Sequence, residues 1–114
     1  MGQLDKTVVE RLRESVGDEA FAEIARDFIA DSKRIEQGLR AALKNADPVA
    51  ARASAHELRG LAGTFGAALL EQSCREIEAR GGAALREVHH AVELCSKVRD
   101  DMKRVIGGGR VGAA

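Results

Sequence analysis

Apolar residues recur every three or four positions along almost the whole chain, which is the period of an amphipathic α-helix. The pattern predicts five helices, over residues 4–15, 19–44, 48–65, 67–80 and 84–105. The residues expected to face a common core are Leu4, Val8, Leu12, Phe21, Ile24, Phe28, Ile35, Leu39, Leu43, Ala51, Ala55, Leu58, Ala62, Phe65, Leu70, Cys74, Ile77, Val88, Val92, Cys95, Val98, Met102 and Val105. No segment alternates with the period of a strand, so the chain is predicted to be all-α. Four long segments with short connections favour an antiparallel four-helix bundle with an additional short N-terminal helix.

Residues that begin or end helices separate these segments. Those expected to do so are Gly17 and Gly66 as C-terminal caps, Asp18 and Asp47 as N-terminal caps, and Pro48 at a first helical position. A turn is expected at residues 81–82, which are both glycine. Residues 1–106 are predicted to form the bundle domain, and the glycine-rich residues 107–114 a flexible C-terminal tail. The initial methionine and this tail suggest a complete small protein.

Composition narrows the classes of protein that fit. The 114 residues suffice for one domain, and 45% hydrophobic with 32% charged residues excludes wholesale disorder. The formal net charge is zero and the two signs alternate, which argues against a nucleic-acid or anionic-membrane binder. No apolar run approaches the ~18 residues of a membrane span, and the N-terminus lacks a signal peptide, so we expect a cytoplasmic protein. Cys74 and Cys95 fall on apolar stripes and are expected to be buried free thiols.

The predicted helix over residues 48–65 carries the candidate chemistry. His56 is offset by one position from the apolar stripe and shares its own face with Arg52, Arg59, Gly60 and Gly63. A glycine inside a helix costs about 1 kcal/mol relative to alanine, so two glycines beside a histidine need an explanation. They would leave room for another macromolecule or a phosphoryl group to approach the imidazole. Arg59 can donate charge-assisted hydrogen bonds to phosphoryl oxygens, and histidine is a covalent nucleophile.

A purely structural interpretation explains each of these residues separately. Most histidines on exposed helix faces are inert, glycines also allow close packing of helices, and the two arginines could be ordinary solvated charges. The combination of all of them on one face favours phosphoryl transfer.

The run His56-Glu57-Leu58-Arg59-Gly60, followed by small residues at 62 and 63 and by Gly66-Ala67, resembles the motif of histidine-containing phosphotransfer (HPt) domains. Leu70, Cys74, Ile77 and Glu78 resemble the run that often follows the motif in that family. The resemblance covers residues 19–105. It departs from the family at Arg59, where a lysine is usual; an arginine keeps the charge and reach but is planar and bidentate.

The resemblance implies a phosphorelay function in two-component signalling. His56 would accept a phosphoryl group from a phospho-aspartate of a response-regulator receiver domain and pass it to a receiver aspartate. Arg59, Gly60 and Gly63 would stabilise or admit the phosphoryl group, and Arg52 and Glu57 would contribute to docking of the partner. The expected partners are receiver domains and a hybrid histidine kinase. The chain would be a monomeric phosphohistidine carrier rather than an independent catalyst, with no metal or cofactor of its own, and Mg²⁺ would be bound by the receiver.

Three other interpretations stay open at this point. Glu87-x-x-His90 is a step that di-iron helical bundles use twice, together with further carboxylates, but it occurs here once. A bundle of this shape could act as a structural or adaptor module. The acidic residue directly after His56 also fits the dimerisation helices of histidine kinases, although no ATP-binding domain follows and the glycines at 60 and 63 fit an HPt domain better.

Overall fold

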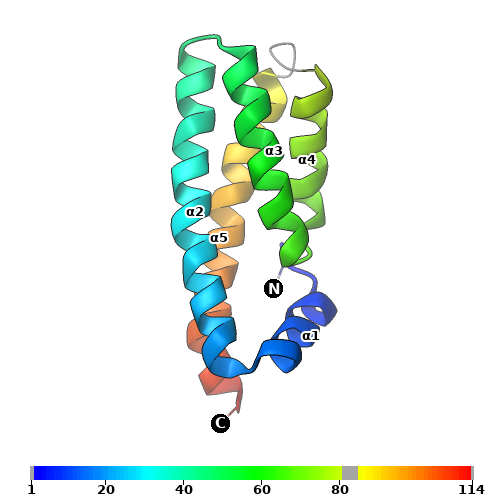
Figure 1. Cartoon of the computed structure of the whole chain (residues 1–114), viewed down its shortest axis with the longest axis vertical. Helices are drawn as coiled ribbons and strands as arrows, with labels where there is room; N and C mark the ends of the chain where they lie inside the picture. Colours follow the sequence, from blue (N-terminus) through cyan, green and yellow to red (C-terminus); the bar gives the residue numbers. More distant parts are fainter. Residues whose placement is uncertain (1, 81–84, 114) are drawn as a thin grey trace.

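The computed structural model describes residues 2–80 and 85–113, with side chains over 2–80 and 86–107. Five helices account for the regular structure of this part of the chain: α1 (Lys6–Val16), α2 (Asp18–Lys44), α3 (Pro48–Thr64), α4 (Ala68–Arg80) and α5 (Leu85–Ala113) (Figure 1). No strand occurs within the described ranges, so the all-α prediction is confirmed. None of the helices there is long and apolar enough to cross a membrane.

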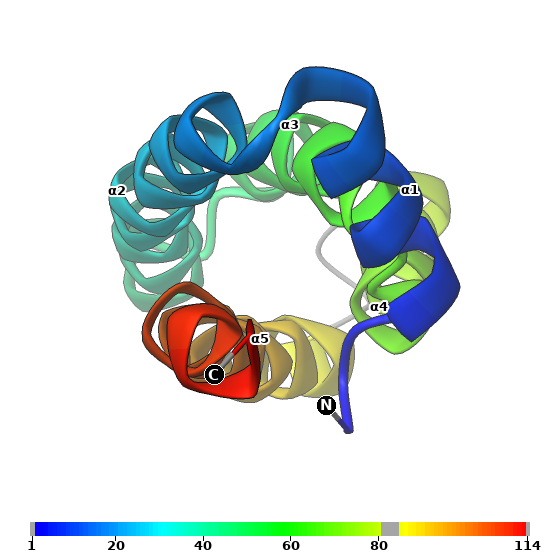
Figure 2. The ribbon, with the colours of Figure 1, turned by 90° about the horizontal axis from the view of Figure 1, so that it is seen from below.

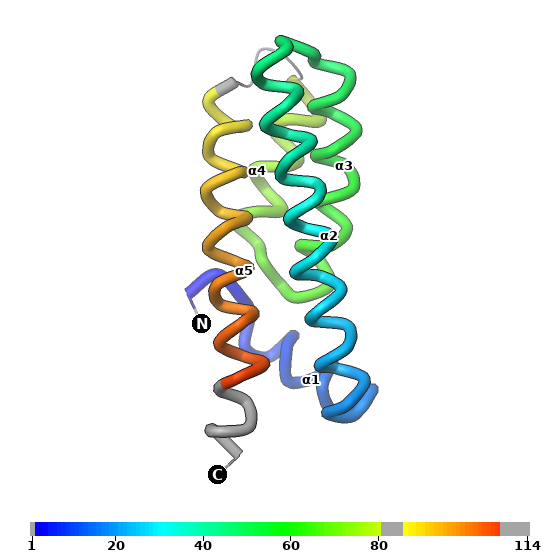
Figure 3. Tube along the Cα trace, turned by 90° about the vertical axis from the view of Figure 1, so that its left-hand side faces the viewer, coloured from blue at the N-terminus to red at the C-terminus, as the bar shows by residue number. Residues whose placement is uncertain are grey.

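Helices α2, α3, α4 and α5 surround a common core, and successive helices run in opposite directions (Figures 1 and 2). Each of the four contacts two neighbours, α2 with α3 and α5, and α4 with α3 and α5. The molecule is elongated, with principal extents of 47 × 20 × 20 Å. The short α1 lies at one end of this arrangement (Figure 3), where the Asp5 amide donates to the Gly66 carbonyl at 3.1 Å. This contact ties the N-terminal segment to the turn between α3 and α4.

The apolar stripes of the sequence form the core, and three aromatic rings pack together within it. Phe65 makes edge-on contacts with Phe21 and Phe28, at centroid distances of 6.3 and 5.0 Å. Most of the predicted core residues are buried; Val8, Leu12, Ile24 and Leu43 are only half-buried. Within α1, Val9 rather than Val8 enters the core, because Val8 packs against the backbone of Gly66.

Caps explain where the helices begin and end. Gly17 has φ of +89°, which favours glycine, and its amide donates to the Arg13 carbonyl at 2.8 Å. The prediction of Asp18 as an N-cap is wrong by one residue, because Gly17 occupies the cap position and Asp18 lies in the first turn of α2. A carboxylate in the first turn still interacts favourably with the positive end of the helix dipole. The Asp47 cap is confirmed, since its Oδ1 accepts from the Ala50 amide at 3.1 Å, and Pro48 follows it as expected.

The last helix is longer than the sequence pattern predicts. The apolar stripe ends at Val105, whereas α5 continues to Ala113. The flexibility expected for residues 107–114 stays a prediction. The turn expected at residues 81–82 lies outside the described residues.

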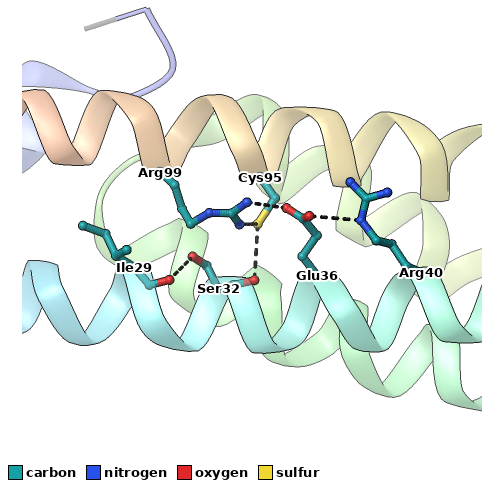
Figure 4. Close-up of polar contacts among 6 residues, drawn as sticks. All are labelled: Ile29, Ser32, Glu36, Arg40, Cys95 and Arg99. Carbon is teal, nitrogen blue, oxygen red and sulfur yellow. Dashed lines mark hydrogen bonds and ion pairs between the residues drawn. The ribbon is translucent and has the colours of Figure 1, made fainter.

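A cluster of polar side chains lies between α2 and α5 (Figure 4). Glu36 accepts hydrogen bonds from Arg99 Nη2 at 2.7 Å and from Arg40 Nε at 3.1 Å. Arg99 Nη1 also donates to the Cys95 sulfur at 3.2 Å, and that thiol in turn donates to the Ser32 carbonyl at 3.6 Å. The Glu36 and Arg99 side chains are about 10% exposed. This cluster is therefore a nearly buried ion pair that joins two helices distant in sequence.

Both cysteines are buried free thiols, as the sequence predicts. Burial raises the pKa of Cys74 to about 12 and that of Cys95 to about 11. Since the thiolate is the reactive form, both thiols are expected to be inert packing groups.

Candidate functional site

His56 lies on α3 and points away from the core, with its side chain 71% exposed. Ala55, one residue before His56, and Leu58, two residues after it, are completely buried between the helices. Because successive helical residues are rotated by about 100°, Ala55 and Leu58 lie about 60° apart around the helix, and His56 lies about 100° from Ala55 on the side away from Leu58. The position of the apolar stripe thus places the imidazole at the surface.

The carboxylate of Glu78, on the neighbouring helix α4, contacts the inner nitrogen of the imidazole. Glu78 Oε1 lies 2.7 Å from His56 Nδ1. An ionised carboxylate can only accept a hydrogen bond, so this contact favours the tautomer with the proton on Nδ1. In that tautomer the lone pair of the ring is on Nε2. The arrangement leaves a nucleophilic nitrogen unprotonated on an exposed side chain.

Arg59 turns from α3 toward the same carboxylate. Its Nε forms an ion pair with Glu78 Oε2, but this buried N–H is not aligned for a hydrogen bond. Arg59 Nη2 lies 3.4 Å from His56 Nδ1. When Nδ1 carries the proton, both atoms are donors, so the shorter contact to Glu78 decides the protonation of the ring. One carboxylate therefore orients both the imidazole and the guanidinium.

Sequence reasoning named Glu78 only as part of a family pattern and assigned it no role at the site. The available signal was its position on the helix that follows the histidine helix. Which residue of α4 faces His56 depends on how the two helices pack, which the apolar period alone does not determine.

The pKa of Glu78 reflects two opposing influences. Partial burial is the largest and acts to raise the pKa. The contacts with His56 and Arg59 together outweigh it, and the pKa lies below its ordinary value of 4.5. Glu78 is therefore ionised at neutral pH.

We predict a pH-dependent contribution of Glu78 to stability. A lowered pKa in the folded state means that the contribution is present above about pH 4.5 and is lost as the pH falls through the folded-state pKa. Glu78→Gln should thus be less stable than the parent near neutrality, by less than about 1 kcal/mol because the pair is partly exposed. The difference should shrink at acid pH. Urea unfolding of both proteins at neutral and acid pH checks this, and a difference that grows on acidification would contradict it.

The two glycines of the motif have different surroundings. A Cβ built on Gly60 would meet no atom within 4 Å, so this part of the helix surface is open. A Cβ on Gly63 would lie 3.1 Å from the carboxylate oxygen Oε2 of Glu71 on α4. Gly60 thus fits the expected access to the imidazole. At Gly63, by contrast, the Glu71 carboxylate lies close over the bare helix backbone.

Because Gly60 is helical and unobstructed, Gly60→Ala should stabilise the domain by about 0.5–1 kcal/mol. Gly60→Leu should also fold, because the longer side chain points into open space. Phosphoryl transfer should slow strongly in the leucine variant and little in the alanine variant, since only leucine covers the approach to the imidazole. Denaturant unfolding and transfer kinetics of the pair check this, and equal transfer rates in both variants would refute a role of Gly60 in access.

Two further predicted residues lie beside His56. Glu57 accepts from Arg34 of α2 at 2.6 Å, so it joins α2 and α3 at the level of the histidine. Arg52 is exposed one turn before His56. A Cβ on Gly38 would lie 2.9 Å from the Ser54 hydroxyl oxygen, which shows how closely α2 approaches α3 here.

The Glu87-x-x-His90 step contacts a serine rather than further carboxylates. The buried Ser73 hydroxyl donates to Glu87 at 2.8 Å, and His90 Nδ1 lies 3.6 Å from the same carboxylate. Within the described residues, no three or more histidine, cysteine, aspartate or glutamate side chains gather as metal ligands. The arrangement thus offers no support for the di-iron interpretation.

The resemblance to HPt domains predicts an exposed imidazole on a helix of an all-α domain, and His56 lies in this way. Residues 23–108 match the Hpt domain family, so the chain belongs to the HPt family of histidine phosphotransfer proteins, which act in phosphorelay signalling. Among solved structures it is similar to histidine-containing phosphotransfer protein B (HptB) from Pseudomonas aeruginosa PAO1, with 27% sequence identity and a TM-score of 0.84. The match covers 92% of this chain and 95% of HptB. No curated protein sequence matches the chain significantly.

Proposed function

We propose that His56 is the residue that carries the phosphoryl group. The observation that carries this proposal is the contact of Nδ1 with Glu78 at 2.7 Å on a side chain that is 71% exposed. It gives an accessible Nε2 lone pair without any proton transfer. The lone pair attacks the phosphorus of a receiver's phospho-aspartate, an N–P bond forms, and the P–O bond breaks with its electron pair leaving on the aspartate. Attack by a receiver aspartate on the phosphohistidine is the reverse of this step.

The neighbouring residues supply positioning and charge. Arg59 reaches the phosphoryl oxygens as a charge-assisted donor, as lysine does in most of the family. Gly60 and Gly63 keep the approach to His56 open, and Arg52 and Glu57 take part in docking. Phosphoryl transfer depends mainly on positioning and charge neutralisation, so the receiver and its Mg²⁺ provide the rest of the catalytic machinery. The chain is then a phosphohistidine carrier that needs no cofactor of its own.

The packing of the helices fits a rigid platform for docking. We infer that α2–α5 form an antiparallel four-helix bundle with α1 as an additional N-terminal helix, and that α2 and α3 present the docking face. Such contacts are transient and bury a modest area. The partners we expect are receiver domains and a hybrid histidine kinase, bound by a monomer in the cytoplasm.

Incubation with a panel of phosphorylated receiver domains tests the proposal. Trypsin cleaves after Arg52 and Arg59, and the peptide of residues 53–59 contains His56 as its one histidine. His89 and His90 share a different peptide, residues 87–97. We expect acid-labile, alkali-stable phosphate in the first peptide. Phosphate confined to the second peptide, or none from any receiver, would exclude His56 as the carrier.

A further inference from the structure

The carboxylate of Glu78 contacts two residues that the proposed function uses for different purposes. Its Oε1 lies 2.7 Å from His56 Nδ1, and its Oε2 pairs with Arg59 Nε. The guanidinium expected to neutralise a phosphoryl group is therefore already paired with a carboxylate before that group arrives. Phosphorylation must either leave this pair in place or break it.

The charges of the transfer step distinguish these alternatives. Only a neutral ring has the Nε2 lone pair that attacks phosphorus, and in this form the negative charge of Glu78 is balanced by Arg59. When Nε2 bonds to phosphorus while Nδ1 keeps its proton, the ring acquires a positive charge next to Glu78. The phosphoryl group adds about two negative charges and three acceptor oxygens beside the ring. A new cation then faces Glu78, and a new anion lies within reach of Arg59.

We infer, on the basis of the proposed function, that phosphorylation exchanges ion-pair partners at this site. Glu78 changes its cation from Arg59 to the His56 ring, and Arg59 moves to the phosphoryl oxygens. Glu78 and Arg59 each have a partner of opposite charge in both states, about one negative charge of the phosphoryl group is left to the solvent, and no proton enters or leaves in either direction. When a receiver aspartate takes the phosphoryl group, the N–P electron pair returns to Nε2, the ring becomes neutral, and Arg59 returns to Glu78.

Two features of the unphosphorylated site favour this exchange, although the ion pair between Arg59 Nε and Glu78 Oε2 is close, at 2.5 Å. The guanidinium already lies alongside the ring, with Nη2 3.4 Å from Nδ1. The open surface over Gly60 leaves space for the side chain to move. Glu78 is thus a positioning residue that acts through both the ring and the guanidinium.

The Arg59 side chain itself reports the exchange. We propose to phosphorylate ¹⁵N-labelled protein with phosphoramidate and to follow the Arg59 Nε–H signal by NMR, assigned with the Arg59→Lys variant. The signal should shift on phosphorylation, and His56→Gln should show no shift even if His89 or His90 becomes labelled. An unchanged Arg59 signal in protein whose His56 is phosphorylated would overturn the exchange alone. Failure of His56 to take any phosphate would instead overturn the proposed function.

Kinetics with Glu78→Gln test the role of the charge. The amide oxygen can still accept from Nδ1–H, but it cannot balance a cationic ring. Replacing a charge-assisted hydrogen bond by a neutral one costs about tenfold in rate, whereas release of Arg59 from its partly exposed ion pair speeds the step by less than about fivefold. Acceptance from a phosphorylated receiver should therefore slow by about tenfold, while ¹⁵N shifts still show the Nδ1–H tautomer.

The matched control is Glu71→Gln. Glu71 lies two turns earlier on α4, has similar exposure, and pairs with Arg75. Its replacement should leave the rate of acceptance unchanged within about twofold. A Glu78→Gln variant that accepts phosphate as fast as the parent would show that the charge of Glu78 plays no part.

Discussion

Replacement of His56 by glutamine is expected to abolish phosphoryl acceptance while the helical fold stays intact. Glutamine has no nitrogen with a lone pair able to attack phosphorus, so the variant has no nucleophile at this position. Its amide group can still donate to Glu78, so that carboxylate keeps a partner. Because the side chain at this position is 71% exposed and the core residues beside it are unchanged, the free energy of unfolding should change by no more than about 0.5 kcal/mol. Labelling by a phosphorylated receiver, together with circular dichroism and urea unfolding, measures both quantities.

His89→Gln is the control for this experiment. His89 is also exposed but lies on α5, which does not contact α3 closely. The control should accept phosphate as the parent does. Stoichiometric labelling that persists in His56→Gln and is lost in His89→Gln would move the phosphorylation site to α5 and refute the proposed site.

The exposure of His56 could be predicted from sequence because it depends only on helical geometry. The apolar stripe of α3 fixes which side of that helix is buried, and the histidine lies one position outside it. Ala51, Ala55, Leu58 and Ala62 are all buried as predicted. Local signals were equally sufficient at the Asp47 cap, where one side chain and the following proline define the start of α3.

Contacts between helices could not be predicted in the same way. Glu78 and His56 are 22 residues apart, and their meeting depends on the relative rotation and height of α3 and α4. The apolar period gives the buried side of each helix but neither of these quantities. The burial of Val9 in place of Val8 has a similar cause, because Val8 lies against Gly66 in the turn between α3 and α4, and this contact between distant segments is not visible in the apolar period. The site is thus a tertiary feature built on elements that are locally encoded.

The second large effect concerns stability and involves the ion pair between α2 and α5. Arg99→Met is expected to destabilise the protein by about 3 kcal/mol, because it leaves the nearly buried Glu36 with only the more exposed Arg40. Glu36→Leu should cost as much or more, about 3–5 kcal/mol, since the Arg99 guanidinium would retain only the Cys95 sulfur as an acceptor. A domain of this size is stable by about 5–15 kcal/mol, so either loss would be readily measured by urea unfolding.

The double variant distinguishes the net contribution of the ion pair to stability from the cost of leaving one of its two charges unpaired. Glu36→Leu combined with Arg99→Met leaves no buried unpaired charge, only the exposed Arg40 without its partner, and adds apolar surface, so it should be more stable than either single variant. Lys97→Met, which breaks the exposed Lys97–Glu93 pair on the same helix, should have little effect. A double variant as unstable as the sum of the two single ones would show that the two residues act independently. Phosphoryl acceptance should persist in the double variant, because Glu36 and Arg99 contact neither His56 nor Glu78. This ion pair is therefore expected to contribute to stability and not to transfer.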